Sequence, residues 1–240
     1  MLGFFGRHVV ELYRRGLKLF VRAPWIVAIV IVPEFLQHVA EIQIGFFDSR
    51  AAARTLANDP TRWAFGYAKL AGLLIAMLAA ARYWGGQTSG RRWWQLGDIR
   101  RGTLAFSMLL FLGISAAVGL LEHRIPTLPY QLLYWGTSIA VLPFILSIVG
   151  ALLGDPRAHP VREYWRNWRW VPLLLLLLVL AYLPGMTLHY GFHHFAFGRP
   201  PAFVWALMVL DAFAVALIAT NVGAALALVD EADRSRRMPG

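Results

Sequence analysis

The chain has 240 residues, of which 58% are hydrophobic and 15% are charged, and its mean hydropathy of +0.55 exceeds what a soluble domain of this length carries. It has no cysteine, which excludes disulfide bonds, thiolate catalysis and cysteine-ligated metal sites. The formal net charge of +10 lies in short clusters between apolar runs, a pattern that indicates membrane topology and argues against a nucleic-acid partner.

The first segment, 1–22, is predicted to form a cytoplasmic interfacial amphipathic helix with arginines on one face and apolar side chains on the other. Residues 13–18, with the sequence YRRGLK, resemble a twin-arginine signal. Arg22 interrupts the apolar run that follows, however, and the run contains Glu34 and Glu41 and no small-x-small cleavage motif. We therefore expect this segment to stay in the mature protein.

Six segments are long and apolar enough to cross a hydrocarbon core, which takes about 20 residues each. They are 24–46, 63–83, 103–121, 130–153, 170–187 and 202–228. The chain is thus predicted to be all-α, a polytopic transmembrane bundle over 23–228, with the lipid bilayer as its environment and a cytoplasmic tail at 229–240. Pro33, Pro143 and Pro184 lie inside or near the ends of these segments and predict kinks or early stops.

The distribution of lysine and arginine orients the bundle. One side carries 17 of these residues outside the spans and the other carries five, which are Arg50, Arg54, Arg62, Arg124 and Arg199. Because cytoplasmic loops are enriched in basic residues, both termini are predicted to be cytoplasmic. Of the 23 basic residues only two are lysines, a composition typical of a bacterial proteome, so we expect the bacterial inner (plasma) membrane.

Three basic, aromatic-rich stretches, 11–22, 90–101 and 161–170, precede the odd-numbered spans and recur along the chain. They suggest three helical hairpins, each with an interfacial lead-in helix. The alternative is that any hairpin protein with basic cytoplasmic loops shows such a pattern.

The stretch 160–169, PVREYWRNWR, carries a family resemblance. A similar stretch precedes a long apolar helix in the bacterial six-span membrane domain that occurs in uncharacterised inner-membrane proteins and is fused to some glycerophosphodiester phosphodiesterases. The resemblance concerns the layout of most of the chain and implies no catalytic residues. The family's small-residue and glycine patterns are not evident here.

Five ionisable residues fall inside the predicted spans. Glu34, His38 and Glu41 have the spacing i, i+4, i+7, which places them on one helical face, while Lys69 and Asp211 lie in the second and sixth spans. With a rise of about 1.5 Å per residue, all five lie roughly 7 to 18 Å below the outer ends of their helices. Because charges at that depth must be paired or solvated, we expect a polar binding pocket in the outer half of the membrane. The alternative is a network that only joins helices.

The string HYGFHH contributes His189, His193 and His194 and is predicted to lie in the external loop after the fifth span. On a helix, His189 and His193 would share a face, a spacing that suits Zn²⁺ or Cu²⁺. The string also resembles one histidine box of membrane di-iron desaturases, but those enzymes use several boxes on the cytoplasmic side. The simpler interpretation is an interfacial loop with rings at headgroup level.

The arginine–tryptophan stretches on the cytoplasmic side are candidates for contact with anionic lipid headgroups or with a protein partner subunit. Ordinary topology anchoring is the alternative. The residues concerned are Arg91, Arg92, Trp93, Trp94, Arg166, Trp168 and Arg169.

The chain has no P-loop, dinucleotide-binding, zincin or nucleophile-elbow motif, and the sequence assigns no cofactor. We therefore expect a non-enzymatic inner-membrane protein that handles a small or amphiphilic substrate or an ion, in transport or a lipid-related process. A membrane subunit or assembly factor of a larger complex is the second hypothesis, and an intramembrane lipid-modifying enzyme is the third.

Overall fold

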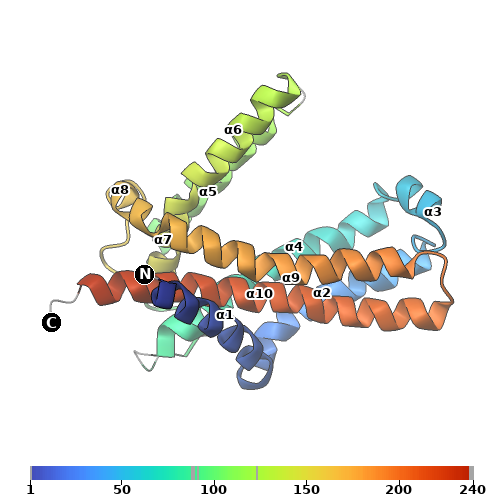
Figure 1. The fold of residues 1–240 in the computed structure, drawn as a ribbon, viewed down its shortest axis with the longest axis horizontal. Helices are drawn as coiled ribbons and strands as arrows, with labels where there is room; N and C mark the ends of the chain where they lie inside the picture. The colour runs from blue at the N-terminus through green and yellow to red at the C-terminus, as the bar shows by residue number, and fades with distance from the viewer. Residues whose placement is uncertain (1, 88–89, 91, 123, 238–240) are drawn as a thin grey trace. The chain divides into compact units, whose positions relative to one another are not determined.

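The computed structural model describes residues 2–87, 90, 92–122 and 124–237, and within these ranges the regular secondary structure is entirely helical, as predicted. The elements are α1 Leu2–Arg22, α2 Pro24–Gln43, α3 Arg50–Thr55, α4 Pro60–Gly86, α5 Arg101–Gly119, α6 Thr127–Ala140, α7 Leu142–Leu152, α8 Tyr164–Asn167, the 3-10 helix η2 Trp168–Trp170, α9 Val171–Ala196 and α10 Pro201–Arg237 (Figure 1).

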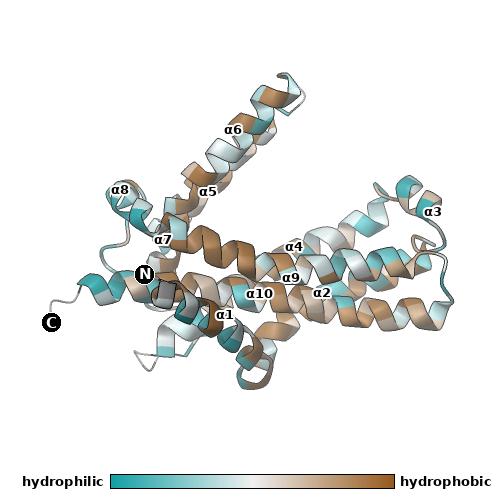
Figure 2. Cartoon of the chain, viewed as in Figure 1, coloured by the Kyte–Doolittle hydropathy of each residue, from teal (hydrophilic) through white to brown (hydrophobic). Residues whose placement is uncertain are grey.

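Six helical stretches in the described part of the chain are long and apolar enough to cross a membrane, and they coincide with the six predicted spans. They are Pro24–Gln43, Pro60–Gly86, Arg101–Gly119, Thr127–Leu152, Tyr164–Ala196 and Pro201–Arg237. Apolar residues dominate the middle of these helices (Figure 2). The chain is therefore a multi-pass integral membrane protein.

The helix ends differ from the prediction in two places that matter for function. α9 continues to Ala196 instead of ending at 187, so the histidine string is helical and not part of a loop. The chain turns only after this point, where Gly198 adopts a positive φ of 69° and is followed by two prolines. α10 likewise continues through the predicted tail as far as Arg237.

The three prolines that predicted kinks or early stops have different positions in the helices. Pro33 and Pro184 lie inside continuous helices, whereas Pro143 follows the break between α6 and α7.

Of the three predicted lead-in segments, the first is helical, as α1. The stretch 161–170 contains only the short α8 and η2, and the described residues of 90–101 form turns up to the start of α5 at Arg101.

Buried Arg82 explains why the segment before α5 is not a helix. Its Nε donates to the backbone carbonyl of Trp93 at 3.0 Å, and its other nitrogens bond the carbonyls of Gln95 and Leu152 and the carboxylate of Asp98. Carbonyls that a helix would use internally are thus occupied by a guanidinium. The predicted interfacial helix at 90–101 is therefore wrong.

The chain divides into two compact units, Met1–Ala80 with Leu177–Ala225 and Ala81–Leu176 with Leu226–Gly240. In the first unit, α2, α9 and α10 run alongside one another (Figure 1). Close to the α2–α3 connection, this unit has a small aromatic and aliphatic core. The core comprises Phe46, Phe47, Ala53, Ala196, Val204, Leu207 and Met208.

Glycines set the helix spacing in the first unit. A Cβ at Gly72 of α4 would lie 2.6 Å from the carbonyl oxygen of Ile29 in α2, and one at Gly185 of α9 would lie 3.2 Å from the carbonyl oxygen of Ala214 in α10. Because membrane helices associate through close backbone contact at small residues, these positions bring α4 against α2 and α9 against α10.

We predict that Gly72→Leu lowers the free energy of unfolding by about 2 kcal/mol, because the obstructing atom is backbone and cannot rotate away. The thermal midpoint in detergent should fall by about 5 °C. Gly113→Leu in α5 is the matched control, since no heavy atom lies within 4 Å of a Cβ there. Equal midpoints for the two variants would contradict the close α2–α4 approach.

Candidate functional site

The α2 side chains Glu34, His38 and Glu41 lie on one helical face and are all fully buried, with 0% of each residue exposed. They project from consecutive turns because residues three and four positions apart overlie one another on a helix. Asp211 of α10 is also 0% exposed and lies opposite them. Four ionisable side chains therefore meet in the interior of the first unit.

His38 is the centre of this arrangement. Its Nδ1 lies 3.0 Å from Glu41 Oε2 and its Nε2 lies 2.8 Å from Asp211 Oδ2. The same Nε2 is 3.2 Å from Glu34 Oε1. An ionised carboxylate only accepts hydrogen bonds, so ionised Glu41 and Asp211 require a donor at both ring nitrogens. The His38 ring is therefore held between three carboxyl groups.

Two further cations reach the carboxylates from α4. Lys69 Nζ lies 2.8 Å from Glu34 Oε1, and Arg62 Nε lies 2.8 Å from Glu41 Oε1. With His38 protonated, three cations balance three carboxylates, which is the condition for burying such charges in a low-dielectric interior. The pairing of Lys69 with a carboxylate was predicted from its depth, whereas the role of Arg62 was not.

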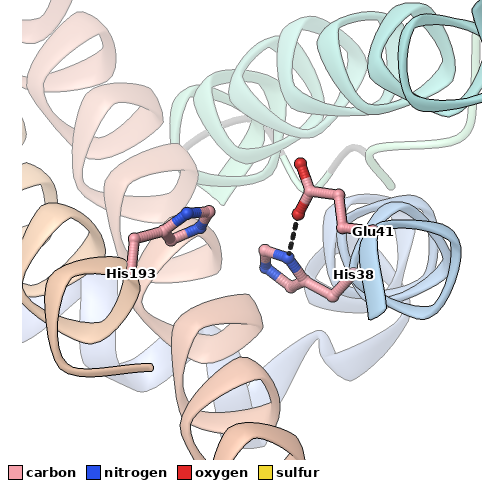
Figure 3. A group of neighbouring side chains, drawn as sticks. All are labelled: His38, Glu41 and His193. Carbon is pink, nitrogen blue, oxygen red and sulfur yellow. Dashed lines mark hydrogen bonds and ion pairs between the residues drawn. The ribbon is translucent and has the colours of Figure 1, made fainter. Parts of the chain in front are cut away.

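His189 and His193 join the same cluster, because α9 continues past the predicted end of its span. His189 Nδ1 lies 2.8 Å from Asp211 Oδ2, and His193 Nε2 lies 3.3 Å from the same oxygen. Figure 3 shows His193 on α9 and His38 on α2 directed toward the same space, with ring centroids 5.3 Å apart. From the sequence, these histidines were predicted to lie in an external loop, apart from the intramembrane carboxylates.

The donor atoms are grouped closely enough to share a metal ion. Three sets of ligand atoms lie within 4.8 Å of one another, namely His38–Glu41–His193, His189–His193–Asp211 and Glu34–His38–Asp211. Nitrogen and oxygen ligands at about 2.0–2.1 Å from Zn²⁺ are separated by about 3.3 Å in a tetrahedral site. The separations of 2.8 to 3.3 Å around Asp211 Oδ2 are of that size.

Three ionisable-group atoms of the cluster are buried without a hydrogen bond among the described residues, both carboxylate oxygens of Glu34 and His193 Nε2. Glu34 Oε1 lies in an ion pair with Lys69, and His193 Nε2 lies 3.3 Å from Asp211 Oδ2. Buried polar atoms are nearly always satisfied. A cation bound beside His193 and Asp211 would give His193 Nε2 a partner.

His194, the third histidine of the string, lies outside the cluster. It is exposed, and its Nε2 is 2.9 Å from Arg50 Nη2. Successive helical residues point about 100° apart, so His193 and His194 face different surroundings. The three predicted metal ligands are thus divided between two sites.

The described arginines and tryptophans of the two stretches predicted to be cytoplasmic lie in the second unit. Arg91 is outside the described residues, and Arg92 stacks over the Trp94 ring at 5.5 Å. Arg169 Nη2 is 2.6 Å from Asp233 Oδ1, and Arg166 pairs with Glu163. These ion pairs within the chain were not foreseen, and contact of this segment with lipid or a partner stays a prediction.

Comparison of the chain with protein-family models, with curated proteins and with solved structures found no match. The resemblance to the six-span membrane domain therefore stays a prediction.

We predict that Lys69→Met alone lowers the free energy of unfolding by about 3 kcal/mol, because it leaves Glu34 buried beside fewer cations. The double variant Glu34→Gln with Lys69→Met should be more stable than the single variant, since it removes both charges. Denaturant titration in detergent measures the free energy of unfolding of both variants. Lys18→Met, which removes the other lysine, is the control. If the effects of Glu34→Gln and Lys69→Met on the free energy of unfolding simply add in the double variant, the pairing is contradicted.

Proposed function

We propose that this protein is a six-span protein of the bacterial inner membrane, with both termini cytoplasmic, that binds a divalent transition-metal ion in the outer half of the membrane. The observation that carries the proposal is the convergence of three histidines, from α2 and α9, on the buried carboxylate of Asp211. The arginine distribution supports the orientation.

The donor set favours Zn²⁺ among common metals. Imidazole and carboxylate ligands without thiolate suit Zn²⁺, which four such groups bind tetrahedrally. His189, His193 and Asp211 form one set whose ligand atoms lie within 4.8 Å of one another, and His38 Nε2 lies 2.8 Å from Asp211 Oδ2. Arg62 and Lys69 then have the role of outer partners, because each orients a glutamate at the edge of the cluster.

Metal binding at this site is linked to protons. Both ring nitrogens of His38 lie against carboxyl groups, so a nitrogen that carries a proton there must lose it before it binds a metal. Binding therefore releases a proton, and the affinity rises as the pH rises. Such an exchange of a proton for a metal ion suits ion handling in a membrane, where buried ionisable residues line ion pathways.

The main competitor is a network that only joins helices. That alternative accounts for the pairs of Glu34 with Lys69 and of Glu41 with Arg62. It does not account for His193 Nε2, which is buried without a hydrogen bond in the described part of the chain. The subunit hypothesis rests on the arginine–tryptophan stretches, of which Arg166 and Arg169 are paired within the chain, and it has less support.

The test is isothermal titration of Zn²⁺ into the full chain in detergent after treatment with a chelator. We expect one Zn²⁺ per chain, with affinity at least about 10-fold lower for His189→Ala, His193→Ala and Asp211→Asn. His8→Ala is the control, because His8 bonds a carbonyl of its own helix, α1. Binding should be tighter at about pH 8 than at about pH 6.

The proposal fails if the folded wild-type chain binds no Zn²⁺, or if His193→Ala binds as well as His8→Ala. An affinity that is equal at the two pH values would overturn the proton exchange.

A further inference from the structure

A pocket separate from the metal cluster opens at the end of α9 in the first unit. Its volume is about 290 Å³, and its lining comes from α3, from the last turn of α9 and from the loop before α10. The lining residues are Arg50, His194, Phe195, Phe197, Gly198 and Arg199.

The two arginines give this pocket a positive charge. No acidic residue lines it, and neither Arg50 nor Arg199 has an ion pair within the described part of the chain. Arg50 Nη2 instead contacts His194 Nε2 at 2.9 Å. The pocket therefore presents two guanidinium groups that have no ion pair in the described part of the chain.

The placement of these arginines is unusual for this chain. They are two of only five basic residues that lie outside the spans on the side predicted to be external. A third residue of that group, Arg62, is paired with Glu41. On the side of the bundle where basic residues are rare, two of them share one pocket.

The loop that carries Arg199 is held in place. The backbone N–H of Gly198 donates to the carbonyl of Phe47 at 2.9 Å, and the ring of Phe197 lies 5.9 Å from that of Phe47. On the opposite wall, Ser49 caps α3 by accepting from Ala52 N at 3.0 Å. The two arginine-bearing segments are therefore positioned before any ligand arrives.

Phosphate is the ligand chemistry that fits this pocket. Guanidinium groups form bidentate, charge-assisted hydrogen bonds with phosphate oxygens. Exposed Phe195 offers an apolar surface beside the charge. We propose that this pocket binds a phosphate group, either of a lipid headgroup or of a free phosphate.

The test uses the full chain in a non-ionic detergent, titrated with inorganic phosphate and separately with short-chain phosphatidylglycerol below its micellar concentration. We expect the double variant Arg50→Gln with Arg199→Gln to bind at least about 10-fold more weakly than wild type. Arg50→Lys should also bind more weakly, because it keeps the charge but loses the guanidinium fork. Arg54→Gln is the matched control, since Arg54 is an exposed arginine of α3 that does not line the pocket.

Binding of both ligands supports a site for phosphate itself, and binding of phosphatidylglycerol alone supports a lipid headgroup. The proposal is overturned if wild type binds neither ligand, or if the double variant binds as Arg54→Gln does. Zn²⁺ titration of the same preparations separates the two sites. The double variant should bind Zn²⁺ like wild type, and His193→Ala should keep its phosphate affinity.

Discussion

The structure depends on one constraint, that a carboxylate buried among membrane helices must have a cation beside it. Each buried carboxylate of the first unit meets that condition, in the pairs Glu34 with Lys69, Glu41 with Arg62, and Asp211 with His38. These pairs join α2 to α4 and to α10. His189 then ties α9 to the same carboxylate of α10. The ion pairs thus connect four helices as well as forming the candidate site. Removal of one charge would weaken contacts among α2, α4, α9 and α10.

Close packing of the backbone makes these pairs geometrically possible. Gly72 lies one turn from Lys69 on α4, and its missing side chain lets α4 approach Ile29 of α2. Without that approach the ammonium group would have to extend further to reach Glu34. Near the α2–α3 connection, Phe46 and Phe47 pack with Ala196 and Met208, and the Phe47 ring lies 5.4 Å from that of His193. An apolar cluster of this kind lowers the local dielectric, which strengthens the ion pairs next to it.

Much of this arrangement was predictable from sequence, and the failures have physical causes. The spacing of Glu34, His38 and Glu41 defines a helical face, and a fixed rise per residue gives depth, so the approach of Lys69 and Asp211 followed from local geometry. The end of α9 was placed too early because Thr, His, Tyr and Gly lower the hydropathy without breaking a helix. The predicted helix at 90–101 is wrong because Arg82 of α4, outside that segment, binds its carbonyls. Such side-chain contacts from another element leave no periodic signal in the sequence.

The histidines show how neighbours decide chemistry that residue type alone leaves open. His38 lies between carboxyl groups, which accept hydrogen bonds when ionised. His194 faces a guanidinium, which only donates, with its Nε2 2.9 Å from Arg50 Nη2. His193, adjacent to it in sequence but turned toward Asp211, has a buried nitrogen without a hydrogen bond in the described part of the chain. The end of α9 therefore presents His194 to a cationic pocket and His193 to an acidic cluster. Because these two environments attract ligands of opposite charge, the same short histidine string serves two different sites.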